Sequence, residues 1–285
     1  MDFQLPERFN WSTIKLVGVS PKHYVAALQQ PREDTDALQT GRAIHTAIYE
    51  PEEFEKRYLV SPRFNRAMKD ETALSKGYDG GREAYAAFMA LAVKEEAEII
   101  PAETRRIAIA VRDSLHADPV TGPMIRGGYS EQSLEWTDEE TGMPCRGRVD
   151  HVNGRLSDLK TTTHDGLLRF PREIAKYSYH GQIAFYSDGL AACGIEVEHP
   201  PAIIAVEKAA PYDAVVYELG ARELDAGRRM YREYLRTIQR CAENGDWPGI
   251  SGGKVVPLEL PEWAMPKVEL TMGGVALGSA LELEA

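Results

Sequence analysis

Two short apolar segments around Asn153-Gly154 constrain the fold of this chain more than any other part of its sequence. Residues 145–152 and 155–161 both have the composition of short strands. Asn-Gly between two such runs is a strong hairpin signal, because both residues tolerate the positive φ angles of tight turns. The sequence therefore predicts an antiparallel hairpin here.

The hairpin carries charged groups that are suited to phosphodiester chemistry. Asp150 lies on the first strand, and Asp158 and Lys160 lie on the second. Carboxylate oxygens are hard ligands that suit Mg²⁺ or Mn²⁺. A lysine two residues from the second acid could reach the same substrate. These residues are candidates for a metal-dependent catalytic site.

The length of the turn decides whether the acids meet. A strict two-residue turn would pair Asp150 with Ser157 and place Asp158 on the opposite face. An odd-length connection, with Gly154 left-handed in a bulge, would pair Asp150 with Leu156 and place both acids and the lysine on one face. We therefore expect an odd-length or bulged connection. The acidic pattern alone leaves a solvated edge hairpin as an open alternative.

Length and composition are those of a folded domain. The chain has 285 residues, of which 43% are hydrophobic and 27% charged. No apolar run has the length of a membrane span, and residues 1–4 lack signal-peptide character, so we expect no membrane partner and a cytoplasmic protein. Three widely spaced cysteines form no zinc or iron–sulfur pattern, which predicts reduced thiols.

The net charge of −11 argues against a generally basic nucleic-acid-binding surface. Basic residues do gather in residues 63–82, and arginines recur in residues 222–240. Either run could contact DNA or be a solvated helix face. Carboxylates collected for a metal would also add to the acidic count.

The order of expected elements predicts a mixed α/β fold with a central sheet flanked by helices. Helices are expected over 22–28, 35–50, 51–58, 83–97, 103–117, 179–193 and 221–243, and strands over 131–136, 145–152, 155–161, 202–207 and 214–218. We expect a loop over 61–81. Residues 1–247 are interpreted as one domain, mainly helical over 1–125 and with the sheet over 126–247, followed by an irregular tail over 248–285.

The helix expected at 179–193 carries polar groups near the acidic hairpin. Tyr179, Gln182, Ile183 and Tyr186 fall on one helical stripe. If Ile183 packs on the sheet, Gln182 and Tyr186 reach the edge of the acidic site. The alternative is an ordinary tyrosine-rich core stripe.

The ordered motifs resemble the PD-(D/E)XK nuclease superfamily, within it the RecB-like and RecE-like (exonuclease VIII) exonucleases. The resemblance spans roughly residues 12–240 and rests on Ser20-Pro21-x-His23-Tyr24, Thr40-Gly41-Arg42-Ala43-Ile44-His45, Glu50-Pro51-Glu52-Glu53-Phe54, Gly147-Arg148-Val149-Asp150, Asp158-Leu159-Lys160 and Gln182-Ile183-Ala184-Phe185-Tyr186. It implies a restriction-endonuclease-like core. Asp158 stands where many members have glutamate, and both acids occur in the superfamily.

The resemblance also implies residue roles. Metal ligands would be His45, Asp150, Asp158 and the main-chain carbonyl of Leu159, with a weaker supporting role for Glu131. Lys160 would position or activate the attacking water. Gln182 and Tyr186 match the helix motif beside the site. The implied cofactor is Mg²⁺ or Mn²⁺, and no ATP-binding loop is present.

The implied activity is a metal-dependent DNA exonuclease. Relatives act on duplex DNA ends in the 5′ to 3′ direction, form homo-oligomeric rings, and work with a single-strand annealing protein in recombination or repair. Three alternatives stay open. They are an endonuclease or junction-processing nuclease, an inactive nuclease fold that binds DNA or a partner, and an enzyme acting on a small phosphate ester.

Overall fold

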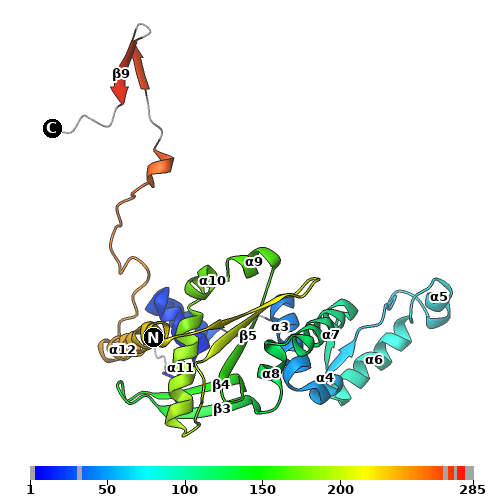
Figure 1. Ribbon diagram of the computed structural model, residues 1–285. Helices are drawn as coiled ribbons and strands as arrows, with labels where there is room; N and C mark the ends of the chain where they lie inside the picture. Colours follow the sequence, from blue (N-terminus) through cyan, green and yellow to red (C-terminus); the bar gives the residue numbers. More distant parts are fainter. Residues whose placement is uncertain (1–3, 31–33, 266–268, 273–274, 280–285) are drawn as a thin grey trace. The chain divides into compact units, whose positions relative to one another are not determined.

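The computed structural model describes residues 4–30, 34–265, 269–272 and 275–279 of the chain. It contains two compact units, Met1–Trp247 and Pro248–Ala285. The first unit holds a five-stranded sheet between helices, which confirms the mixed α/β class expected from the sequence (Figure 1).

The sheet has the strand order β3-β4-β5-β6-β7. Its strands are β3 (Tyr129–Thr137), β4 (Pro144–Val152), β5 (Leu156–Thr162), β6 (Ala202–Glu207) and β7 (Ala214–Glu218). Only β5 and β6 run parallel, and the other neighbours are antiparallel. β6 is buried along its whole length, and its sequence is apolar from Ala202 to Val206 before it ends at the buried Glu207.

Helices from both ends of the chain cover one face of the sheet. They are α1 (Trp11–Ile14), the 3₁₀ helix η1 (Lys15–Gly18), α2 (Pro21–Gln29), α11 (Tyr179–Ala192) and α12 (Ala221–Asn244). Ser20 caps α2 by accepting a hydrogen bond from the main-chain N–H of His23. One apolar cluster joins these helices to the sheet through residues such as Trp11, Phe185 and Leu235.

The other face is covered by helices that precede the sheet in sequence. They are α3 (Asp36–Tyr49), α4 (Pro51–Arg57), α7 (Ala102–Ala117) and α8 (Thr121–Ile125). A second apolar cluster includes Ile44, Val111 and Leu159. The apolar residues of α3 pack in this second cluster. His45 of α3 is half-buried and lines a cavity together with residues of the sheet.

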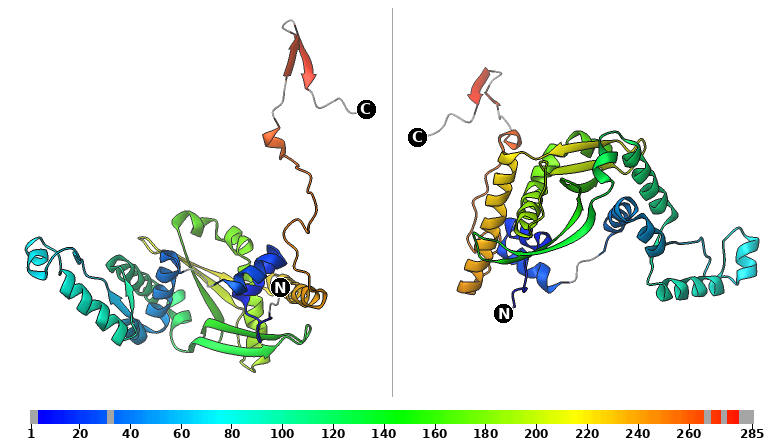
Figure 2. Two further views of the ribbon diagram at one scale, coloured as in Figure 1. Left: turned by 180° about the vertical axis from the view of Figure 1, so that it is seen from behind. Right: turned by 60° about the horizontal axis from the view of Figure 1, so that its bottom comes forward.

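The segment between α4 and α7 is more ordered than the expected loop. Two short strands, β1 (Tyr58–Val60) and β2 (Glu98–Ile100), pair in parallel. Between them lie α5 (Asp70–Ser75) and α6 (Arg82–Lys94), which extend away from the five-stranded sheet in the views of Figure 2. The expectation of a loop over 61–81 was therefore wrong at α5. Asp70, the first residue of α5, accepts hydrogen bonds from the N–H groups of Gly81 and Ala84, which link α5 to the start of α6.

The connection between β4 and β5 confirms the odd-length turn. Val152 pairs with Leu156, which leaves three residues in the loop, and Gly154 has a φ of +60°. The expected pairing of Asp150 with Leu156 was wrong. The observed register is shifted by two residues and, if continued, would set Asp150 opposite Asp158.

Two other segments have more regular structure than the sequence indicated. The crossover from β5 to α11 contains α9 (His164–Leu168) and α10 (Phe170–Lys176). In the second unit, the tail expected to be irregular contains a 3₁₀ helix, η2 (Glu262–Ala264), and an antiparallel pair, β8 (Glu269–Met272) with β9 (Val275–Ser279).

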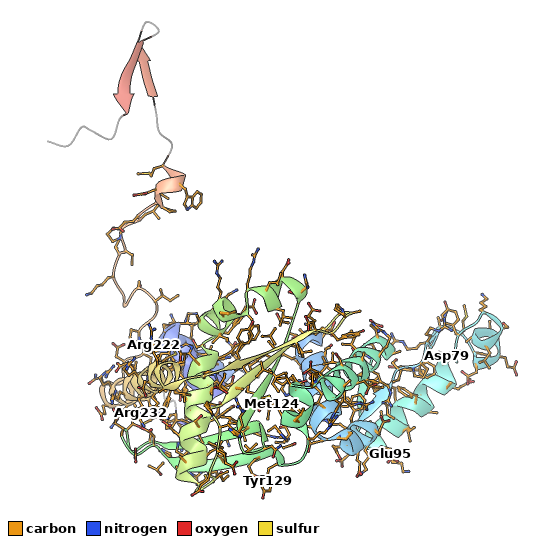
Figure 3. The ribbon with its side chains drawn as sticks, viewed as in Figure 1. Asp79, Glu95, Met124, Tyr129, Arg222 and Arg232 are labelled. Carbon is orange, nitrogen blue, oxygen red and sulfur yellow. The ribbon has the colours of Figure 1, made fainter. Side chains whose placement is uncertain are left out.

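A buried polar cluster joins the β3–β4 turn to α11 and α12. Asp138 in the turn accepts hydrogen bonds from the N–H of Thr141 at 2.9 Å, from the hydroxyl of Tyr231 at 3.0 Å and from Nε of Arg232 at 3.2 Å. Asp188 of α11 accepts from the same tyrosine at 2.6 Å. Figure 3 labels Arg232 on α12, where it lies in this cluster.

Several arginines of α12 therefore have structural partners. Ion pairs join Arg228 to Asp188, Arg232 to Asp138, and Arg240 to Glu233. A cavity of ≈ 440 Å³ at this cluster is lined by Arg228 and Arg232 and by three acids, Asp138, Glu139 and Asp188. This part of the basic run stabilises the packing of the helix.

Asp138→Asn tests this cluster through its pH dependence. Burial favours the neutral carboxyl, but hydrogen bonds from Thr141 and Tyr231 and the charge of Arg232 outweigh it, so the pKa of Asp138 lies below its ordinary value. A carboxylate with a lowered folded-state pKa stabilises the fold above its unfolded pKa, near 4, and loses this contribution as the pH falls through the folded value. We expect Asp138→Asn to lower the free energy of unfolding at pH 7 by on the order of 3 kcal/mol.

Urea unfolding at pH 7 and pH 3 measures this effect. The difference between the wild type and Asp138→Asn should shrink at pH 3. An equal difference at both pH values would contradict the charged role of Asp138. Asp113→Asn, at an exposed residue of α7, serves as the control and should change stability little.

Candidate metal centre

Three potential metal ligands from separate elements come together beside the sheet. His45 comes from α3, Glu131 from β3 and Asp150 from β4, and one ligand atom from each lies within 4.8 Å of the others. They line a cavity of ≈ 430 Å³ that is also lined by Lys160 of β5 and by Tyr179 of α11. The fold therefore brings together residues that are more than a hundred positions apart.

The backbone at Glu131 is unusual. In the pairing of β3 with β4, Ser130 lies opposite His151 and Gln132 lies opposite Val149. Glu131 between them has a φ of +52° and is not part of this pairing. Left-handed non-glycine residues concentrate at functional sites, because the strain must be supported by the surrounding structure. Glu131 consequently stands opposite Asp150, and its carboxylate forms an ion pair with Arg148 at 2.6 Å.

Asp150 lies where the main-chain pairing of β4 with β5 ends. Beyond the His151–Ser157 pair, the Asp150 side chain takes the place of a main-chain contact, and its Oδ2 accepts a hydrogen bond from the N–H of Leu159 at 2.8 Å. The same oxygen lies 3.4 Å from Nδ1 of His45. The N–H and C=O of one strand residue point to the same edge of the strand. The carbonyl of Leu159 therefore faces the edge at which Asp150 lies.

Asp158 is buried beneath the cavity and forms an ion pair with Lys160. Neither carboxylate oxygen accepts a well-aligned hydrogen bond from the described residues. Burial raises the pKa of Asp158 to about 6, and the positive charge of Lys160 only partly opposes this effect. Asp158 lies outside the group formed by His45, Glu131 and Asp150.

Lys160 remains a cation in this setting. Burial alone would lower the pKa of its ammonium, but the charges of Asp158 and Asp150 raise that pKa above its ordinary value. The ring of Tyr179 also lies 4.9 Å from Nζ, in a cation–π arrangement. Lys160 can thus stabilise negative charge and donate hydrogen bonds, but a protonated ammonium cannot accept a proton.

Gln182 and Tyr186 lie on α11; Tyr186 is close enough to Asp158 and Asp150 to feel their charges, but neither Gln182 nor Tyr186 lines the cavity. Nε2 of Gln182 donates a long hydrogen bond of 3.5 Å to the Tyr186 hydroxyl. Burial raises the pKa of this phenol to about 12, so it stays protonated. Gly147 of β4 makes the approach possible, because a Cβ there would lie 2.8 Å from the Tyr186 ring.

Tyr49 is a residue of the site that the sequence analysis missed. It lies one helical turn after His45 on α3 and stacks on His151 with ring centroids 5.2 Å apart. Its buried hydroxyl has no hydrogen-bond partner among the described residues. Burial raises its pKa well above the ordinary value, and the nearby negative charge of Asp150 adds to this. The i, i+4 spacing from His45 was the available signal.

The residues present fit a divalent cation. Glu131, Asp150 and Asp158 bring three carboxylates together, and Arg148 and Lys160 supply two cations, which leaves negative charge in a partly buried site. Burial and the charge of Asp150 raise the pKa of Glu131, as expected of crowded acids. Carboxylates suit Mg²⁺ and Mn²⁺, and the imidazole of His45 fits the softer of the two, Mn²⁺.

Residues 10–255 match the family model described as "PDDEXK-like domain of unknown function (DUF3799)". The match covers most of the chain. The chain belongs to this family. It follows that the recognition of the PD-(D/E)XK superfamily from the sequence motifs is confirmed.

Comparison with solved structures supports the same fold. The chain is similar to the crystal structure of a "Putative exonuclease" from Eubacterium rectale, with a TM-score of 0.56 and 14% sequence identity. The match covers 90% of this chain and 91% of that one. No curated protein matches the sequence. None of the helices in the described ranges combines the length and the apolar character needed to cross a membrane.

Glu131→Gln tests whether the geometric group is a metal site. We expect Mn²⁺ affinity, measured by isothermal titration calorimetry, to fall at least about 10-fold, because the variant loses one charged oxygen ligand. Asp150→Asn should weaken binding further. The matched control is Glu103→Gln at an exposed residue of α7, which should bind Mn²⁺ like the wild type. Unchanged affinity in Glu131→Gln would remove this residue from the site.

Proposed function

We propose that this protein is a metal-dependent deoxyribonuclease that hydrolyses phosphodiester bonds from the ends of duplex DNA. The observation that carries the proposal is the convergence of His45, Glu131 and Asp150 beside the Asp158–Lys160 ion pair. These residues line or underlie one cavity in a chain of the PDDEXK-like family.

The proposed chemistry divides between the metal and the protein. A bound Mg²⁺ or Mn²⁺ would polarise the scissile phosphate and lower the pKa of a bound water. His45, Glu131 and Asp150 would hold the ion, with Asp158 and the Leu159 carbonyl as further proposed ligands. The Lys160 ammonium stabilises the negative charge that develops on the phosphate oxygens.

Three neighbouring residues would orient the reactants. The Tyr186 hydroxyl and the Gln182 amide are protonated donors on α11, the hydroxyl lies near Asp150 and Asp158, and both would contact phosphate oxygens. Arg148 is more than half exposed while paired with Glu131, and it can reach an incoming phosphate from that position. The site thus offers cations and hydrogen-bond donors around a metal position.

Finer features of the proposal come from the sequence motifs alone. The RecE-like pattern favours Mg²⁺ as the cofactor, 5′ to 3′ degradation, a ring-shaped homo-oligomer, a single-strand annealing partner, a role in recombination or repair, and action in the cytoplasm. End-labelled substrates would determine the polarity. Light scattering would determine the oligomeric state.

Digestion of linear duplex DNA in Mg²⁺, compared with covalently closed circles, tests the proposal. We expect nucleotides to be released from linear DNA only, and EDTA to stop the release. Lys160→Ala should slow cleavage by on the order of 10²-fold, because it removes one charge stabiliser. Cutting of closed circles would indicate an endonuclease instead.

Two substitutions, Asp158→Ala and Asp158→Asn, test the proposed site in the same assay. Both variants should lose most activity, and circular dichroism would show that they remain folded. The matched control is Asp113→Ala, which removes an exposed carboxylate far from the cavity in sequence. Full activity in folded Asp158→Asn would contradict the proposed site.

A further inference from the structure

The crossover between β5 and α11 places an exposed aromatic ring beside the candidate site. Tyr177 follows α10 and is 43% exposed. Its ring centroid lies 5.6 Å from that of Tyr179, and the Tyr179 centroid lies 4.9 Å from Nζ of Lys160. Tyr177 therefore contacts Tyr179, and Tyr179 in turn contacts the Lys160 ammonium at the cavity.

The exposed ring is held by a row of aromatic residues that reaches the core. Tyr179 stacks on Phe170 at 6.1 Å, and Phe170 stacks on Tyr217 at 5.5 Å. Phe170 is almost fully buried. Because Phe170 is packed in the core and contacts Tyr179, these two rings hold the exposed ring of Tyr177 in place.

The backbone between the two tyrosines is strained. Ser178 has φ +57° and ψ +37°, the left-handed conformation that non-glycine residues rarely adopt. Ser178 lies between the end of α10 and the start of α11, and its conformation brings the rings of the two flanking tyrosines, Tyr177 and Tyr179, together. Strained residues of this kind are retained where the local geometry is needed.

Three cations and one acid, Glu173, lie on the segment from Arg169 to Lys176 that precedes Tyr177. Arg169, Arg172 and Lys176 are exposed, and none forms an ion pair with another residue in the described part of the chain. Nζ of Lys176 lies 5.0 Å from the Tyr177 ring centroid. Arg228, Arg232 and Arg240 of α12 are paired with acids, whereas these three cations are available to phosphates in a chain whose net charge is −11.

We propose that Tyr177 stacks on an unpaired base of the DNA strand whose phosphate lies at Lys160. Arg169, Arg172 and Lys176 would hold the phosphates that flank this base. The inference rests on the proposed function and adds a binding position for single-stranded DNA next to the cleavage site.

The chemistry of the ring selects the unpaired base. A base inside a duplex is already stacked on both sides, whereas an unpaired base offers a free face to an aromatic side chain. Cations along the same surface are the usual second component of single-strand binding. A duplex end that frays, or one that carries a single-stranded extension, supplies such a base.

The test measures affinity for blunt duplex DNA and for the same duplex with a short single-stranded extension, in EDTA so that no cleavage occurs. Wild-type protein should bind the extended DNA more tightly. Tyr177→Ala should lose this preference, with affinity for the extended DNA falling roughly 10-fold, while Tyr177→Phe should keep it.

A second readout reports stacking directly. A 2-aminopurine base in the extension should change its fluorescence on binding to the wild type and to Tyr177→Phe, but not to Tyr177→Ala. The matched control is Tyr78→Ala. Tyr78 is 39% exposed, and it precedes Asp79, which Figure 3 labels near α5 at the far end from α12. This variant should behave like the wild type.

The possible failures are distinguishable. If Tyr177→Ala keeps the preference and the fluorescence change, or loses affinity for both DNAs equally, the inference about the unpaired base is wrong. If the wild type binds neither DNA, the inference is also wrong. If the wild type shows the Tyr177-dependent preference but releases no nucleotides in Mg²⁺, the inference holds and the proposed hydrolysis fails.

Discussion

The excess of negative charge at the sheet edge is the constraint on which the candidate site depends. Glu131, Asp150 and Asp158 lie on three adjacent strands, and Asp158 is fully buried. Burying carboxylates costs free energy unless cations or hydrogen bonds offset it. Lys160 and Arg148 offset part of this charge, and a divalent cation would offset the rest. The same uncompensated negative charge would favour the binding of a divalent cation.

The rest of the fold holds these acids in place. Helix α3 packs through one apolar cluster and presents His45, whereas α11 packs through the other and presents Gln182 and Tyr186. The Asp138 cluster fixes α11 and α12 to the β3–β4 turn at the far side of the sheet. Rigid packing on both faces lets a site built from five elements keep its geometry, which catalysis of phosphoryl transfer requires.

Local sequence signals predicted much of this arrangement. The buried run 202–207 matched β6, and Asn153-Gly154 correctly indicated an odd-length turn. The exact register was missed because Arg155 joins the loop, and nothing local specifies that. The position of Glu131 opposite Asp150 depends on a left-handed backbone that only tertiary packing supports. The aromatic row at Tyr177 depends likewise on the short helix α10, whose length gives almost no periodic signal.

The central claim is that the carboxylates of β3 and β4 and the imidazole of α3 form one metal site. Anomalous diffraction from crystals soaked in Mn²⁺ tests it most directly, since the scattering locates the ion without reference to activity. The account predicts an anomalous peak within about 2.0–2.6 Å of ligand atoms of His45, Glu131 and Asp150. A peak bound elsewhere, with none among these three residues, would contradict it.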